Sequence, residues 1–165
     1  MNSASPYIDI SLARQRLRLL DGERVILEAP VSTARNGPGE HQGSECTPRG
    51  WHVIRIAIGA GCDENTVFVG RRPTGERHTS ALAAQYPGRD WILCRILWLS
   101  GLEPGKNRGG EVDTLRRYIY IHGTPGSEPM GKPRSHGCIR MRTRDLVRLF
   151  GLVGKGTRVL IREGP

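Results

Sequence analysis

Short strand-like segments recur along this chain of 165 residues, and turn residues separate most of them. β-branched and aromatic residues favour strands, and a period of two places alternate side chains on one face of a sheet. The dipeptide Asp21-Gly22 adds a strong hairpin signal. The segments that fit this pattern cover residues 7–12, 16–20, 25–31, 51–58, 65–69, 91–99, 118–121 and 157–162. About eight strands therefore predict a mainly β fold.

One short helix is expected near the C-terminus, after residue 143. Thr143 is the predicted N-cap, and Gly151 marks the end of the helix. Its apolar face is formed by Leu146, Val147, Leu149 and Phe150. The most apolar segment, 91–99, is expected to be a buried central strand, with Cys94 as a small core residue.

The length predicts one domain, which we expect to cover residues 5–163. No apolar run reaches the roughly 18 residues that a membrane span requires. The first six residues contain no basic region followed by an apolar core, so no secretory signal is visible.

The formal net charge is +9, and most of the excess lies in the last third of the chain. From Lys106 onward there are thirteen Lys or Arg residues against five Asp or Glu. This excess suits a polyanionic partner, either a nucleic acid or a polymer that carries carboxylates. A solvated basic surface that keeps the protein soluble is the simpler alternative.

Two histidines and a cysteine lie close together in the stretch from residue 118 to 141. The segment 118–121 is predicted to be a strand that ends at His122, which Gly123 follows. Prolines and glycines in 124–134 predict a loop that brings the chain back. Cys138 would then face His122 from a tight turn.

These residue types suit acyl transfer. A thiol becomes nucleophilic as the thiolate, and a neighbouring imidazole can accept its proton. The carbonyl of Gly123 could hold the histidine tautomer in place of a carboxylate. Gly137 permits a backbone conformation in which successive N–H groups point at one oxygen.

The motif Ser135-His-Gly-Cys-Ile-Arg-Met141, preceded by Ile121-His-Gly-Thr124, resembles the signature of the YkuD-type L,D-transpeptidase catalytic domain. The opening segment 7–22 is similar to the first hairpin of that family. Residues 31–33 and 47–50 resemble its next two landmarks. The resemblance therefore extends over nearly the whole chain.

The resemblance implies two packed sheets, in a β-sandwich-like arrangement, with the active site in a cleft at one end. The stretch 102–113 resembles the lid that covers this cleft. The family cross-links peptidoglycan and uses no cofactor. Peptidoglycan stem peptides are thus the expected donor and acceptor, and the cell envelope or periplasm is the expected location.

The resemblance assigns Cys138 as nucleophile and His122 as general base, with Gly123 orienting the base. Gly137 and the Cys138 N–H are the expected oxyanion hole. Ser135 and His136 are expected to shape the site, and His136 is not expected to take the proton. Arg140 is the candidate for binding a substrate carboxylate in fork geometry.

The implied reaction has two steps. The Cys138 thiolate attacks the carbonyl of the third residue of a stem tetrapeptide, D-alanine leaves, and a thioester remains. An amine of a second stem then attacks to form the cross-link. If water attacks instead, the enzyme is an L,D-carboxypeptidase, and the sequence leaves this alternative open. Carbapenems should acylate the same cysteine.

Two other classes of function remain as alternatives. His122, His136 and Cys138 are residue types that also bind zinc. The basic composition would fit a nucleic-acid-binding module, but the sequence contains no recognised motif of that class. Its three tryptophans are expected in the core rather than as stacking platforms: Trp51, Trp91 and Trp98.

The remaining cysteines show no close ligand spacing. If Cys138 stays free, one disulfide is possible among Cys46, Cys62 and Cys94 in an oxidising compartment.

Overall fold

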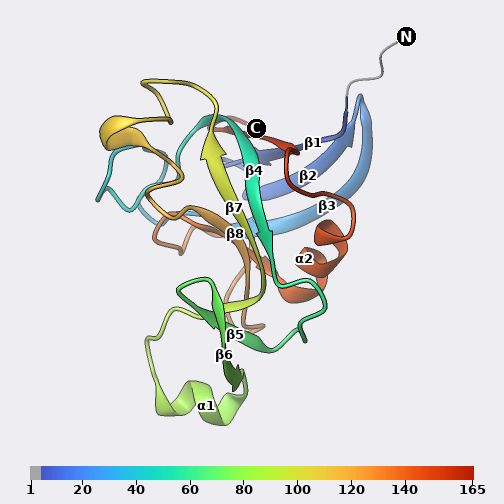
Figure 1. Ribbon diagram of the computed structural model, residues 1–165, viewed down its shortest axis with the longest axis vertical. Helices are drawn as coiled ribbons and strands as arrows, with labels where there is room; N and C mark the ends of the chain where they lie inside the picture. Colours follow the sequence, from blue (N-terminus) through green and yellow to red (C-terminus); the bar gives the residue numbers. More distant parts are fainter. Residues whose placement is uncertain (1–4) are drawn as a thin grey trace.

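The computed structural model describes residues 5–165 and shows ten strands in one continuous sheet (Figure 1). The strands follow the apolar and alternating segments of the sequence, which confirms a mainly β fold. Their bounds are β1 Tyr7–Ser11, β2 Arg16–Asp21, β3 Arg24–Ser32, β4 Gly50–Ile58, β5 Thr66–Val69, β6 Arg72–Arg77, β7 Ile92–Gly101, β8 Tyr120–Thr124, β9 Ile139–Arg142 and β10 Arg158–Arg162.

The sheet closes on itself like a barrel. Its strand order is β4-β10-β1-β2-β3-β9-β8-β7-β5-β6, and β4 also pairs with β7. The long strands β4 and β7 run antiparallel from His52 beside Gly101 to Ile58 beside Ile96. The expected pair of separate packed sheets is therefore replaced by one closed sheet, because this last ladder joins the two halves.

The core fills the inside of this barrel. Alternate residues of the strands point inward, among them Ile8 and Ile10 of β1, Leu17 and Leu19 of β2, and Ile121 of β8. Cys94 is fully buried with them, as expected for a core residue.

Helix α2, Thr143–Phe150, buries Leu146 and Leu149 against the barrel, mainly through β7 and β8. It begins one residue earlier than predicted, because Arg142 occupies the N-cap position and Thr143 is already helical. No cap hydrogen bond comes from the Arg142 side chain, and Asp145 in the first turn supplies the favourable negative charge instead.

The segment between β4 and β7, residues 59–91, extends away from the barrel at the bottom of Figure 1 and is called the excursion below. The sequence indicated only a polar connection over much of this stretch, but the chain forms β6 and the short helix α1, Ser80–Gln85. The Thr79 hydroxyl accepts a hydrogen bond from Leu82 N–H at 3.0 Å and caps α1. The excursion adds the hairpin β5–β6 to one edge of β7.

The predicted lid, residues 102–113, includes the 3₁₀ turn η1, Gly110–Val112. Asn107 is buried and binds the carbonyls of Arg49 and Trp51, at 3.0 Å each. Gln42 N–H donates to the Glu111 carbonyl. The segment is thus attached to the start of β4 and to the preceding loop.

Candidate active site

Strands β8 and β9 run parallel, which brings the two halves of the sequence motif together. Ile121 pairs with Ile139, and His122 pairs with Arg140. The two isoleucines point into the core, so the alternation of side chains places His122 and Arg140 on the outer face. Contrary to the prediction, His122 lies in the middle of its strand rather than at the end.

Cys138 immediately precedes β9 and packs on the same outer face, in a small apolar cluster with Ile96, Tyr120 and Phe68. Its Sγ accepts a hydrogen bond from Tyr120 N–H and donates one to the Tyr118 carbonyl, both at 3.3 Å. The backbone of β8 and of the residues before it therefore fixes the thiol. His122 follows Tyr120 by two residues on the same face, about 7 Å along the strand.

The thiol is protonated at neutral pH. Burial raises the pKa of Cys138 to about 11, although the Tyr120 N–H and the charges of Arg140 and Arg117 act in the opposite direction. Attack on a carbonyl consequently requires a base that removes the thiol proton.

The His122 ring is oriented by its own backbone neighbour. Its Nδ1 lies 2.8 Å from the Gly123 carbonyl oxygen, which can only accept, so Nδ1 carries the proton in this contact. The neutral ring then presents an unprotonated Nε2. Burial lowers the pKa of His122, which keeps the imidazole neutral and able to accept a proton.

Only glycine fits at position 123, because the backbone there lies against β7. A Cβ there would lie 2.6 Å from the Leu93 carbonyl oxygen and 3.2 Å from the Cys94 sulfur. The close approach of β7 thus leaves room only for glycine beside the histidine, and it fixes the carbonyl that His122 contacts.

The turn before the cysteine is built by Ser135 and Gly137. Gly137 has φ +132°, a value that L side chains rarely adopt, and a Cβ there would approach the Cys46 carbonyl oxygen at 3.2 Å. The Ser135 hydroxyl donates to the Cys138 carbonyl at 2.6 Å and accepts from Gly137 N–H at 3.2 Å. The Gly137 N–H is therefore engaged within the turn.

His136 points away from this arrangement. Its side chain is 64% exposed, and its Nδ1 lies 3.8 Å from an Asp90 carboxylate oxygen. Arg140 is almost fully buried and donates to the other oxygen of Asp90 at 2.9 Å. Glu128 lies 3.7 Å from the same guanidinium.

A cavity of about 240 Å³ lies beside Arg140 and His136. Its walls come from α1 and its flanking residues and from the loop after β8, and they include His78, Trp91, Asp90 and Glu128. The predicted lid does not contribute to these walls. The excursion that carries α1 covers this part of the site instead.

Sequence reasoning missed several residues around the site. Asp90 and Glu128 pair with Arg140, but each lies in a polar loop with no distinguishing pattern. Arg117 is half-buried and donates to the Cys46 carbonyl at 2.6 Å, next to the turn that contains Gly137. The one signal in the sequence was that Arg117 directly precedes the predicted strand 118–121, which leads to His122.

All four cysteines are free thiols: Cys46, Cys62, Cys94 and Cys138. Burial raises the pKa of Cys94 to about 12, so this thiol is inert at neutral pH. Within residues 5–165, no three His, Cys, Asp or Glu side chains gather in a way that could hold a metal ion. No helix in the described part of the chain is long and apolar enough to cross a membrane.

Comparison with known proteins identifies relatives of this chain. The family model of the YkuD L,D-transpeptidase catalytic domain matches residues 5–161. The "Putative L,D-transpeptidase YqjB" of Bacillus subtilis is 51% identical over 47 residues, which is 28% of this chain and 27% of the relative. The "Putative L,D-transpeptidase YkuD" of the same organism is 44% identical over 61 residues, covering 36% of this chain and 37% of the relative. The aligned stretches thus span well under half of these relatives.

Solved structures share the fold. An L,D-transpeptidase from Mycobacterium smegmatis aligns with a TM-score of 0.57 at 15% identity, covering 95% of this chain and 58% of the other. The catalytic domain of an Enterococcus faecium L,D-transpeptidase acylated by ertapenem aligns with a TM-score of 0.54 at 19% identity, covering 98% of each chain. Because the family model matches almost the entire chain, this protein belongs to the YkuD family of L,D-transpeptidase catalytic domains.

Proposed function

We propose that this protein is a peptidoglycan L,D-transpeptidase that transfers an acyl group through a thioester on Cys138. The observation that carries the proposal is that a thiol held by the backbone at Tyr118 and Tyr120 lies on the same face of the sheet as an oriented, neutral imidazole. Membership of the family supports the reaction class. We propose residues 5–163 as the catalytic domain, acting at the cell envelope.

In the first step His122 Nε2 accepts the thiol proton while the sulfur attacks the carbonyl of the third stem residue. The neutral histidine and the protonated thiol support this order, since no ion pair exists before attack. The Tyr120 N–H remains on the sulfur and stabilises the developing thiolate.

The oxygen of the tetrahedral intermediate then requires hydrogen-bond donors. The Cys138 N–H is the proposed donor, and the unusual backbone at Gly137 aims it. Because the Gly137 N–H already donates to Ser135, Gly137 acts through its conformation, and Ser135 shapes the turn. Collapse of the intermediate expels the D-alanine amine, which takes the proton from His122.

The cavity beside Arg140 is the proposed place for a carboxylate of the stem peptide. Arg140 is buried and fixed by Asp90, so its charge is already positioned when a substrate enters. His136, at the rim, makes no contact with the thiol that would support a role as base.

The test incubates the reduced protein with a tetrapeptide muropeptide and an excess of an amine acceptor. Mass spectrometry follows both the products and the protein, with Cys138→Ala as the matched control. A cross-linked product, with an acyl adduct that the control lacks, is expected. A tripeptide product alone would identify an L,D-carboxypeptidase, and the absence of both product and adduct would overturn the proposal.

A further inference from the structure

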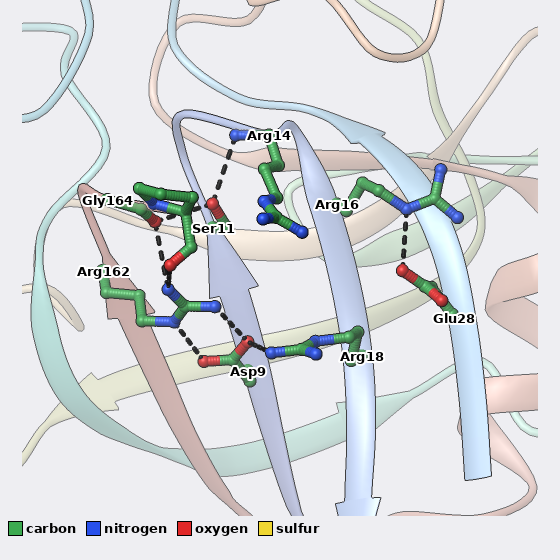
Figure 2. Close-up of polar contacts among 9 residues, drawn as sticks. Asp9, Ser11, Arg14, Arg16, Arg18, Glu28, Arg162 and Gly164 are labelled. Atoms are coloured by element: carbon green, nitrogen blue, oxygen red, sulfur yellow. Dashed lines mark hydrogen bonds and ion pairs between the residues drawn. The ribbon is translucent and has the colours of Figure 1, made fainter. Parts of the chain in front are cut away.

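A second polar cluster lies on the outer face of the barrel, over β1, β2 and β10 (Figure 2). These strands are separated from β8 by β3 and β9 in one direction around the sheet, and by β4 and β7 in the other. The cluster surrounds a hollow of about 180 Å³. Its charged side chains are four arginines, Arg14, Arg16, Arg18 and Arg162, and two carboxylates, Asp9 and Glu28.

Asp9 is the organising group. It is 3% exposed, and its two oxygens accept hydrogen bonds from Arg162 Nε at 2.6 Å, Arg162 Nη2 at 3.0 Å and Arg18 Nη2 at 3.1 Å. The register of the sheet sets this contact, because Asp9 pairs directly with Arg18 across the β1–β2 ladder. Two guanidinium groups are thus held in fixed orientations.

The remaining donors are not all used. Arg162 is engaged on every nitrogen, since its Nη1 also donates to the Gly164 and Pro165 oxygens. Arg18 uses only Nη2, which leaves Nε and Nη1. No hydrogen bond joins the Arg14 guanidinium to any other of residues 5–165, and the side chain is exposed.

Figure 2 shows Arg14, Arg18 and Arg162 pointing toward the same space, whereas Arg16 turns toward Glu28. The cluster holds four arginines against two side-chain carboxylates, and the Pro165 oxygen that Arg162 contacts also lines the hollow. Like charges held this close repel one another and destabilise a fold unless a ligand compensates them. Sites at which a sequence accepts such a local cost in stability are often functional.

We infer that this hollow binds a phosphate dianion, either free or as the terminal group of a phosphate monoester. A carboxylate has two oxygens in one plane, which a single arginine fork satisfies. A phosphate monoester has three acceptor oxygens and a charge near −2, so it matches a basic hollow whose donors arrive from several directions. Arg14 and Arg18 would bind its oxygens, and Arg162 would supply charge.

The experiment titrates the protein with inorganic phosphate at pH 8 and constant ionic strength, followed by calorimetry and NMR shifts, with acetate as the comparison anion. Arg14→Gln is expected to weaken phosphate binding about tenfold or more, the usual loss for a hydrogen bond to a charged group. Arg144→Gln, the same charge change on the exposed side of α2, is the matched control and should bind phosphate like the wild type.

The Asp9→Asn variant distinguishes a preorganised phosphate site from non-specific electrostatic attraction. The substitution makes the hollow more positive but removes the group that orients Arg18 and Arg162. Weaker phosphate binding supports the proposal, and equal or tighter binding overturns it. Acetate binding as tight as phosphate, or equal losses in Arg14→Gln and Arg144→Gln, would also overturn it. If Asp9→Asn does not fold, the Arg14 variant still decides, since no hydrogen bond to another of residues 5–165 depends on that guanidinium.

A second titration identifies the source of the phosphate. Vesicles that contain phosphatidic acid present the monoester on a membrane. Sedimentation of the wild type with these vesicles, lost in Arg14→Gln, supports a lipid head group. Binding of inorganic phosphate without sedimentation supports a small soluble phosphate. These readouts do not involve acyl transfer, so they are independent of the proposed reaction.

Discussion

At the scale of single residues, the proposed nucleophile and base differ from a preformed thiolate–imidazolium pair. Burial raises the pKa of the Cys138 thiol to about 11 and lowers the pKa of His122. Both changes favour the uncharged forms. In the proposed reaction, the thiol would therefore stay neutral until a substrate carbonyl arrives.

The pH dependence of thiol reactivity tests this description. In a Cys46→Ser, Cys62→Ser background, the rate of Cys138 alkylation by iodoacetamide should rise about tenfold per pH unit between pH 7 and 10, because the thiolate fraction rises in that proportion below the thiol pKa. Mass spectrometry of samples quenched at successive times measures the rate. A plateau near pH 8 would show that the thiolate is already formed.

Substitution of the proposed base gives a second prediction. His122→Ala should slow acylation of Cys138 by a donor stem or by ertapenem about 10²–10⁴-fold, the usual contribution of a general base. The rate of adduct formation by mass spectrometry is the measurement, and His136→Ala is the matched control. Equal losses in both variants would contradict the assignment of the base.

At the scale of elements, the ladder between β1, β2 and β10 depends on one buried carboxylate. Burial acts to raise the pKa of Asp9, but the hydrogen bonds and charges of Arg162 and Arg18 outweigh it and lower that pKa below its usual range (Figure 2). A carboxylate with a lowered pKa in the folded state stabilises the fold above the unfolded pKa. That stability is lost as the pH falls through the folded pKa.

Asp9→Asn should accordingly reduce the free energy of unfolding at pH 7 by about 1–3 kcal/mol, because the charged partner of two arginines is removed. Between about pH 4 and pH 2 the difference from the wild type should shrink, since the wild-type carboxylate becomes protonated there. Urea unfolding at several pH values measures this. Glu28→Gln, at the more exposed pair with Arg16, is the control and should change stability by less than about 1 kcal/mol.

At the scale of the whole molecule, stability is unevenly distributed between the barrel and its excursion. Strand β7 is buried along most of its length, whereas β6 is mostly exposed and α1 contains no fully buried residue. Segments with few buried contacts open at low free energy. The wall that covers the cavity beside Arg140 belongs to this weaker part.

Native-state hydrogen exchange should show this difference directly. Amides of β7 and β8 are expected to exchange by global unfolding, and those of β6 and α1 faster by at least about a hundredfold. Mass spectrometry of peptides from timed labelling is the measurement. Equal protection of α1 and β7 would contradict a separately opening wall.

Much of this architecture could be predicted from local sequence. The alternation in 16–20, the apolar run 91–99 and the histidine–glycine and glycine–cysteine pairs specify strands and a turn by short-range rules. The closure of β4 onto β7 could not be predicted, because it depends on long-range register. The partnership of Arg140 with Asp90 was missed for the same reason: fifty residues separate two groups that only the fold brings together.

The pairing of β4 with β7 has a consequence for self-association at high protein concentration. Because this pairing closes the barrel, β6 is the terminal strand of the ten-stranded sheet and pairs on one side only, with β5. An unpaired edge can recruit another chain, and proteins protect such edges with charge and proline. Strand β6 reads Arg-Pro-Thr-Gly-Glu-Arg, so its one exposed edge carries both forms of protection against self-association.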